Sequence, residues 1–177
     1  MSITRRGLAA FPLVSASLAR QLSVQPGRLL NPPSAPIDAV VDSDTYNEID
    51  DQFAVAYALL SAPRINVEAI YAAPYLNERS TSPADGMKKS YDEILRILAR
   101  MNRDSKGFVF GGSERFMGKT AQPVESPAAR DLVGRAMKSR NSPLYVITVG
   151  APTNVSSAIL MEPKIIERIV VVWLGGQ

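Results

Sequence analysis

Neither cysteine nor histidine occurs among the 177 residues of the chain. Without cysteine there is no disulfide framework, no zinc–thiolate site and no thiol nucleophile. Without histidine the chain lacks the commonest general base near neutral pH and the commonest transition-metal ligand. Any chemistry must therefore rest on carboxylates, hydroxyls, amides or a hard cation.

Long apolar segments are also missing. No uninterrupted apolar run reaches the roughly 18 residues of a membrane-spanning helix, so we expect no membrane span. Hydrophobic residues make up 46% of the chain and charged residues 21%, which is near the average for globular proteins and excludes a disordered, collagen-like or coiled-coil chain. A length of 177 residues predicts one folded domain.

The net charge of +3 comes entirely from the first 36 residues. Four of the 20 basic residues and none of the 17 acidic ones precede Asp38, so the rest of the chain has a net charge of −1. A folded surface that follows nucleic-acid phosphates would be basic. We therefore expect no nucleic-acid partner.

Residues 1–36 differ from the rest of the chain in composition. They contain four arginines, no acids and a Pro-rich end at positions 32, 33 and 36. Thr4–Leu8, followed by the apolar stretch to Ala19, has the outline of a twin-arginine export signal, while an Arg-rich, acid-poor segment also fits a transit peptide or an unstructured tail. We predict a leader or disordered tail over 1–36. The expected location is cytoplasmic, with export through the leader as the alternative.

From residue 37 onward, apolar runs alternate with helical patterns. The expected strands cover 37–41, 65–72, 108–110, 144–149 and 169–173, and the expected helices cover 53–60, a segment starting at 83, 127–140 and 154–160. Continuous apolar strands between helices are typical of a parallel sheet that is covered on both faces. The predicted fold is α/β, with an open, mostly parallel, Rossmann-like sheet. Because the chain stops just after a buried type of strand, we expect 37–177 to be the N-terminal part of a truncated domain.

Five carboxylates fall within ten positions after the first strand: Asp42, Asp44, Glu48, Asp50 and Asp51. Ligands of doubly wound sheets bind at this end of the strands. So many negative charges repel one another unless a cation or protons compensate them, and Ca²⁺ or Mg²⁺ is the natural candidate where only oxygen ligands exist. The alternative is a set of solvated turn and helix-cap acids.

The spacing of these acids can be compared with two known motifs, the EF-hand loop and a phosphatase motif. An EF-hand loop that starts at Asp42 would need glycine at its sixth position and glutamate at its twelfth, but these are Asn47 and Phe53. A haloacid-dehalogenase-type phosphatase begins Asp-x-Asp-x-Thr, with the first aspartate as nucleophile and Mg²⁺ as cofactor. Asp42 and Asp44 fit that pattern, whereas Thr45 comes one place early.

A broader resemblance covers the region from residue 37 to the end. Asp-x-Asp, a turn and then Asp-Asp before an Ala/Leu-rich helix resembles the N-terminal signature of the inosine/uridine-preferring nucleoside hydrolases. Residues 146–155, VITVGAPTNV, are similar to that family's strand–Gly-x-x-Thr-Asn–helix segment. Glu162-Pro163 and residues 169–176, IVVVWLGG, are similar to its next stretch. The three segments occur in the family's order.

Two departures from the family pattern are visible. The family has three residues between its second and third aspartates, whereas five separate Asp44 from Asp50, and Glu48 stands at the shorter spacing. Glu48 therefore competes with Asp50 for the same role. The family's later segment, which supplies another aspartate to the metal and a histidine near the leaving base, has no counterpart here.

The resemblance implies hydrolysis of the N-glycosidic bond of nucleosides by water activated by Ca²⁺. It implies that Asp44, Asp51 and the carbonyl of Val149 are metal ligands and that Asp44 also takes the proton of the water. Asp50 and Asn77 would contact the nucleoside, and Asp42 would support the site. A non-catalytic remnant or binding module is the alternative, and the sequence leaves homo-oligomerisation open.

Overall fold

The computed structural model describes residues 33–175, so the predicted leader lies almost entirely outside the described residues. In chain order the elements are β1 (Ile37–Ser43), α2 (Ile49–Leu60), β2 (Ile65–Ala72), α3 (Pro83–Arg100), β3 (Val109–Gly111), α4 (Pro127–Ala136), β4 (Leu144–Val149), α5 (Thr153–Met161), the 3₁₀ helix η1 (Pro163–Glu167) and β5 (Ile169–Trp173). No helix in this range is long and apolar enough to cross a membrane.

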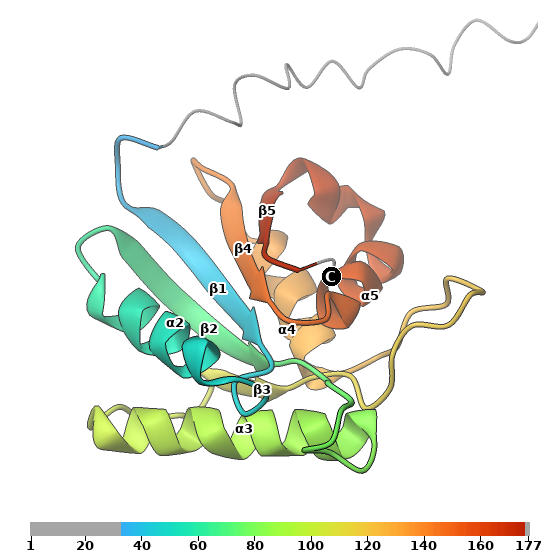
Figure 1. The fold of residues 1–177 in the computed structure, drawn as a ribbon. Coiled ribbons are helices and arrows are strands. Elements are labelled where there is room, and N and C mark those ends of the chain that lie inside the picture. The colour runs from blue at the N-terminus through green and yellow to red at the C-terminus, as the bar shows by residue number, and fades with distance from the viewer. Residues whose placement is uncertain (1–32, 176–177) are drawn as a thin grey trace, which may run out of the picture. The chain divides into compact units, whose positions relative to one another are not determined.

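The five strands form one parallel sheet in the order β3-β2-β1-β4-β5 (Figure 1). The chain therefore builds outward from β1 in one direction and then returns to add β4 on its other side. In such sheets the crevice at this reversal, beyond the carboxyl ends of the strands, is where ligands bind. The register places Asp42 beside Thr148 and Ser43 beside Val149 across this point.

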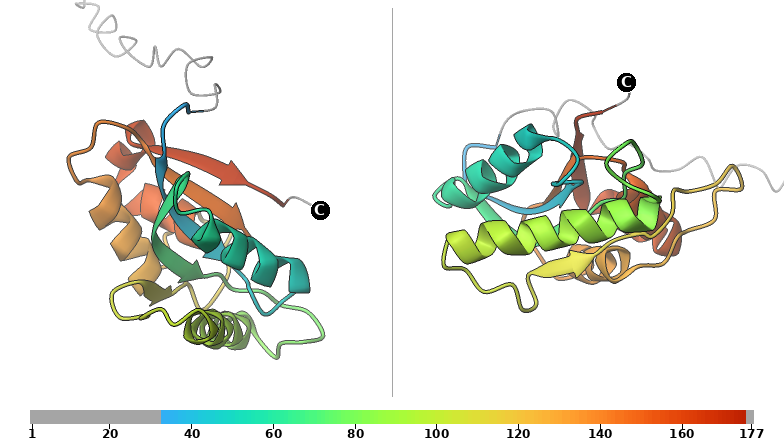
Figure 2. Two further views of the ribbon diagram at one scale, coloured as in Figure 1. Left: turned by 90° about the vertical axis from the view of Figure 1, so that its left-hand side faces the viewer. Right: turned by 60° about the horizontal axis from the view of Figure 1, so that its bottom comes forward.

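Helices cover both faces of the sheet, as predicted (Figures 1 and 2). Successive residues of a strand point to opposite faces: Val40 packs in the core under α4 and α5, and Val41 packs in the core under α2 and α3. On β2, Tyr71 packs in the core under α4 and α5, and Ile70 packs in the core under α2 and α3. Burial of both strand faces explains why β1 and β2 read as continuous apolar runs rather than alternating ones.

Serine caps begin two of the helices as expected. The Oγ of Ser82 accepts a hydrogen bond from Asp85 N at 3.1 Å, and the Oγ of Ser126 accepts one from Ala129 N at 3.1 Å, each with proline next in the chain. The expected end of α4 at Arg140 is wrong: the helix ends at Ala136. Residues beyond it turn back to the sheet, where Arg140 forms ion pairs.

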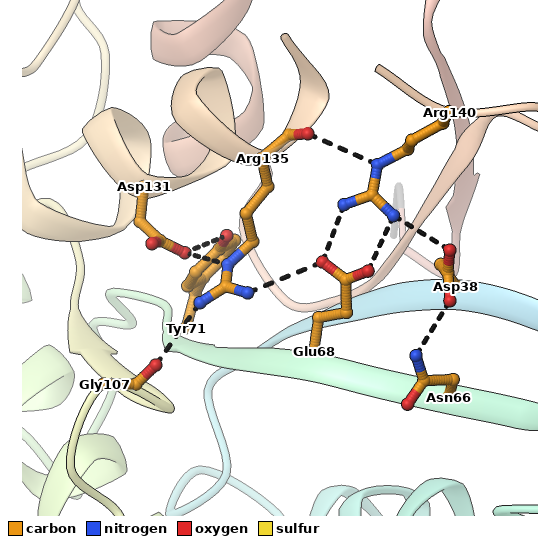
Figure 3. A network of polar contacts seen from close by, with 8 residues as sticks. All are labelled: Asp38, Asn66, Glu68, Tyr71, Gly107, Asp131, Arg135 and Arg140. Atoms are coloured by element: carbon orange, nitrogen blue, oxygen red, sulfur yellow. Dashed lines mark hydrogen bonds and ion pairs between the residues drawn. The ribbon is translucent and has the colours of Figure 1, made fainter. Parts of the chain in front are cut away.

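A network of ion pairs lies at the opposite end of the sheet from the carboxyl ends of β1 and β4 (Figure 3). Arg140 donates from Nη1 and Nη2 to the two oxygens of Glu68, at 2.6 and 2.7 Å, and Nη1 also reaches Asp38 at 2.9 Å. Arg135 bonds Asp131 and contacts Glu68 at 3.5 Å. These side chains are mostly buried, so solvent screens the pairs less than it screens exposed ones.

The network predicts acid sensitivity. Hydrogen bonding to Arg140 lowers the pKa of Glu68 below its usual 4.5, so the stabilisation is complete above pH 4.5 and is lost as the pH falls through the lowered pKa. We expect Glu68→Gln to lower the free energy of unfolding at pH 7 by about 1–3 kcal/mol and to weaken this acid dependence, as measured by urea denaturation. Asp92→Asn is the control, because the Asp92–Lys88 pair is exposed, and it should change stability by less than about 0.5 kcal/mol.

Candidate functional site

The carboxyl end of β1 carries a run of buried polar residues. Asp42, Ser43 and Thr45 are fully buried, and Asp44 is 6% exposed. Ser43 and Thr45 satisfy each other through a hydroxyl hydrogen bond of 2.7 Å. Because buried polar groups are costly without partners, the two aspartates must be held by residues from other elements.

Asn154, in the first turn of α5, holds Asp42. Its Nδ2 donates to Asp42 Oδ1 at 2.8 Å and to the carbonyl of Ala72 at 3.2 Å. Its Oδ1 accepts from the backbone N–H and the hydroxyl of Ser113, at 2.8 and 2.9 Å. One fully buried amide therefore joins the ends of β1 and β2 to the loop after β3.

Gly112 allows this amide to reach its partners. A Cβ at Gly112 would lie 1.9 Å from the carbonyl oxygen of Ala72 and 2.5 Å from Asn154 Nδ2. No side chain fits in that space, so the glycine is required by packing. Gly112 is not one of the residues with a positive φ angle in the part of the chain that the structure describes, so backbone conformation is not the reason for a glycine here.

A cavity of about 470 Å³ opens at the carboxyl ends of β1, β4 and β5. Acids line one side of it: Asp44, Glu48, Asp50 and Asp51. The other lining residues are Asn47, Val149, Gly150, Ala151, Trp173, Leu174 and Gly175. A larger hollow, about 580 Å³, lies at the other end of the sheet, beside Glu68 and Arg140. Its carboxylates are already paired with arginines, so the smaller cavity is the better candidate site.

Two contacts position the Asp44 carboxylate. Its Oδ2 accepts a hydrogen bond from Asn47 Nδ2 at 3.0 Å. On its other side is Gly150, where a Cβ would lie 2.8 Å from Asp44 Oδ1. The glycine after β4 thus lets the two strand ends approach closely at the point where the Val149 carbonyl emerges.

Asn77 reaches the site through Asn47 and is not among the residues that line the cavity. Its Nδ2 donates to Asn47 Oδ1 at 2.6 Å, and Arg79 Nη1 donates to the Asn47 carbonyl at 2.7 Å. The loop after β2 therefore braces the long turn between β1 and α2. Contact of Asn77 with a ligand remains a prediction.

The acids of the cavity have no cationic partner. None of the ion pairs formed by residues 33–175 includes Asp42, Asp44, Glu48, Asp50 or Asp51. Burial, followed by the negative charge of Asp44, raises the pKa of Asp51 to about 8. Burial also raises the pKa of Asp44, and that of Asp42 to about 7. Within residues 33–175, therefore, no ion pair balances the negative charge of these acids.

The donor set suits a hard cation but does not complete its coordination. No group of three or more acidic side chains in residues 33–175 is arranged to hold a metal ion by itself. Asp44, Asp51 and Val149 line the same cavity, and the negative charge of Asp44 contributes to the raised pKa of Asp51. Two carboxylates and one carbonyl are ligands that Ca²⁺ accepts, and Ca²⁺ takes its remaining oxygens from water or a ligand.

Asp42 faces away from the cavity, which argues against the phosphatase hypothesis. It is fully buried against Asn154 and does not line the cavity. A nucleophile must reach its substrate, so this carboxylate is not placed to attack a phosphate. The structure instead gives Asp42 a supporting position at the end of β1.

Glu48 and Asp50 are both exposed and both line the cavity, so either one can reach a ligand. Asn47, Gly150 and Trp173 are site residues that the sequence reasoning did not identify. Gly150 lay within a motif that was noted. Trp173, the only tryptophan of the chain, likewise lies within the segment 169–176 that resembles the family.

The packing around Asn154 predicts contrasting effects for two glycine substitutions. Gly112→Ala should lower the free energy of unfolding by at least about 2 kcal/mol, because the new methyl group collides with backbone. Gly134→Ala, in α4, meets nothing within 4 Å and should raise it by about 0.5–1 kcal/mol through helix propensity. Urea denaturation compares them. Equal effects would show that the approach at Gly112 is not tight in solution.

The buried aspartates predict a second pH dependence. Without divalent cations, the free energy of unfolding should rise as the pH falls from 8 towards 5. The folded-state pKa values of Asp42 and Asp51 lie near 7 and 8, above the usual 3.8, so in this range the folded chain takes up protons that the unfolded chain does not.

Asp51→Asn should flatten that dependence and stabilise the chain at pH 8 by about 1–3 kcal/mol. Denaturation in chelator at several pH values measures both effects. Glu125→Gln, an exposed acid paired with an exposed Arg130, is the control and should leave the slope unchanged. Stability that decreases between pH 8 and 5 would contradict the prediction.

No protein-family profile and no curated protein sequence matches the chain. Solved structures do match. An inosine-guanosine nucleoside hydrolase superposes with a TM-score of 0.54 and 16% identity, over 78% of this chain and 48% of that one. A purine-preferring ribonucleoside hydrolase from Gardnerella vaginalis gives 0.53 and 16%, over 79% and 49%. The type III effector protein XopQ, complexed with adenosine diphosphate ribose, gives 0.55 and 12%, over 81% and 46%.

These similarities confirm the predicted α/β class and, at the level of fold, the resemblance to nucleoside hydrolases. The chain spans about half the length of each of the three proteins. With identities of 12–16%, the likeness shows the fold alone. Residues 33–175 thus have the fold of about half a nucleoside hydrolase chain.

Proposed function

We propose that this site binds Ca²⁺ and a nucleoside, and that the whole protein hydrolyses the N-glycosidic bond between base and ribose. One observation carries the proposal: two largely buried carboxylates, which no cationic side chain of residues 33–175 pairs with, line a cavity at the reversal point of a parallel sheet. A divalent cation would relieve the repulsion between them. The nucleoside hydrolases of the same fold support the choice of substrate class.

Asp44, Asp51 and the carbonyl of Val149 would hold the ion. When bound, Ca²⁺ would make a water more acidic and offer coordination positions to the ribose hydroxyls. Asp44 would accept the proton of that water, with its carboxylate oriented by the Asn47 amide. General-base assistance of this kind contributes about 10²–10⁴-fold to the rate.

The remaining residues would bind the sugar. Asp50 would accept a hydrogen bond from a ribose hydroxyl, and Glu48, equally exposed on the same cavity, is the competitor for that role. Asn77 would approach the nucleoside from the loop after β2, beside Asn47. The turn between Asp44 and Asp50 is two residues longer than in the family pattern, so the spacing does not decide between Glu48 and Asp50. Each of these two acids therefore needs its own variant.

We expect Asp44→Asn and Asp51→Asn each to weaken Ca²⁺ binding at least about tenfold, because each removes a charged ligand. Asp44→Asn should also lower ribose release from inosine or uridine by about 10²–10⁴-fold. Calorimetry and a reducing-sugar assay measure the two effects, and Glu125→Gln is the matched control. Ca²⁺ affinity unchanged in Asp51→Asn would remove the metal site from the proposal.

Two outcomes and one further ligand test the alternatives to nucleoside hydrolysis. Ca²⁺ and nucleoside binding without ribose release would identify this chain as a binding module. Because XopQ is described in complex with adenosine diphosphate ribose, that compound belongs in the binding assay. Phosphate release that needs Asp42 and Mg²⁺, without ribose release, would instead support the phosphatase hypothesis.

A further inference from the structure

The residues that line the candidate cavity fall into two chemically different groups, which we call its two walls. Acids from the β1–α2 segment form one of them, and Asn47 lies beside them. The end of β5 and the turn after β4 form the other, with Ala151, Trp173, Leu174 and Gly175. A carboxylate wall suits a cation and hydroxyl groups, whereas an aromatic and aliphatic wall suits an apolar, flat group. A ligand that matches both walls has a polyol at one end and a planar group at the other.

Trp173 is held in a defined orientation at the mouth of this cavity. Its Nε1 donates a hydrogen bond to the Gly150 carbonyl at 3.1 Å. On its other side the chain passes so closely that a Cβ at Gly175 would lie 2.7 Å from Nε1 and 2.9 Å from Cε2. The N–H of the indole is therefore already used, while the residue as a whole remains 50% exposed.

Trp173 differs from its neighbour Val172 on β5 in lining the cavity, although both are equally exposed. Val172 is also 50% exposed, but it does not line the cavity. Trp173 is 50% exposed and does line it. The register aligns Trp173 with Thr148, and Thr148 with Asp42, so the indole lies at the same level of the sheet as the end of β1. Trp173 is therefore placed to contact a ligand in the cavity and is not merely exposed at the edge of the sheet.

We propose that Trp173 is a specificity-determining residue, whose ring stacks on the aromatic base of a bound nucleoside while the acid wall holds the sugar. The inference rests on the proposed function and adds the residue that distinguishes a nucleoside from a free sugar. Stacking of a base on an aromatic side chain corresponds to a change in affinity of about 5- to 100-fold on removal of the ring.

Because Trp173 is the only tryptophan, its fluorescence reports on this wall directly. In the full 177-residue chain with Ca²⁺ present, inosine should quench or shift the emission in a saturable way. Ribose at saturating concentration should leave the emission close to that of the Ca²⁺-loaded protein. An inosine titration that saturates by calorimetry but leaves the emission unchanged would overturn the inference.

Three variants separate stacking from structure. Trp173→Leu should weaken inosine binding about 5- to 100-fold and leave ribose binding within about twofold of the unaltered chain. Trp173→Phe keeps a ring but loses the bond to Gly150, and should restore most of the inosine affinity. Val172→Ala, on the same strand but away from the cavity, should change neither. Calorimetry with Ca²⁺ measures all of them.

The outcomes also separate this inference from the proposed function. Ribose and inosine that bind with similar affinity, both unaffected by Trp173→Leu, would refute stacking and leave the metal–sugar site in place. Equal losses for ribose and inosine in Trp173→Leu would show that the indole only shapes the site, which also refutes stacking. Failure of the unaltered chain to bind either compound with Ca²⁺ would refute both proposals.

Discussion

The central constraint on this structure is the burial of Asp42, Asp44 and Asp51, which form no ion pair with any arginine or lysine of residues 33–175. Burying an ionised group without a partner is expensive, and proteins respond by protonating it, hydrogen-bonding it or binding a cation. Asp42 is hydrogen-bonded by Asn154, and the pKa of Asp51 rises to about 8. Carboxyl groups with strongly shifted pKa values are common at functional sites, and Asp44 and Asp51 combine such shifts with a place in the lining of a cavity.

The two ends of the sheet differ in how their carboxylates are neutralised. At one end, Glu68 is paired with Arg140 and its pKa is lowered (Figure 3). At the other end, Asp51 has no such partner and its pKa is raised. The paired end stabilises the fold at neutral pH, whereas the acids at the other end are left to line a cavity. This division matches the general rule that ligands bind at the carboxyl ends of parallel strands.

Much of the fold could be predicted because its local signals agree with its packing. The bounds of β2, β4 and β5 match the expected 65–72, 144–149 and 169–173, since each is an apolar run that ends at a turn. Prediction failed where contacts distant in sequence override local pattern. Residues 137–140 continue a helical pattern, but Arg140 leaves it to pair with Glu68, 72 positions away. The resemblance to the nucleoside hydrolases predicted that Asp44, Asp51 and Val149 would lie together, and all three line one cavity; their roles remain predictions.

The sequence by itself determined the class of fold, because apolar runs specify buried strands. It also limited the candidate ligands of a metal ion to oxygen, because the chain has no cysteine or histidine. Tertiary structure decided which oxygens face the cavity. It turned Asp42 inward to Asn154, 112 positions away, and brought Trp173 to the Gly150 carbonyl. Strand order sets these contacts, and strand order depends on packing between distant segments rather than on any local pattern.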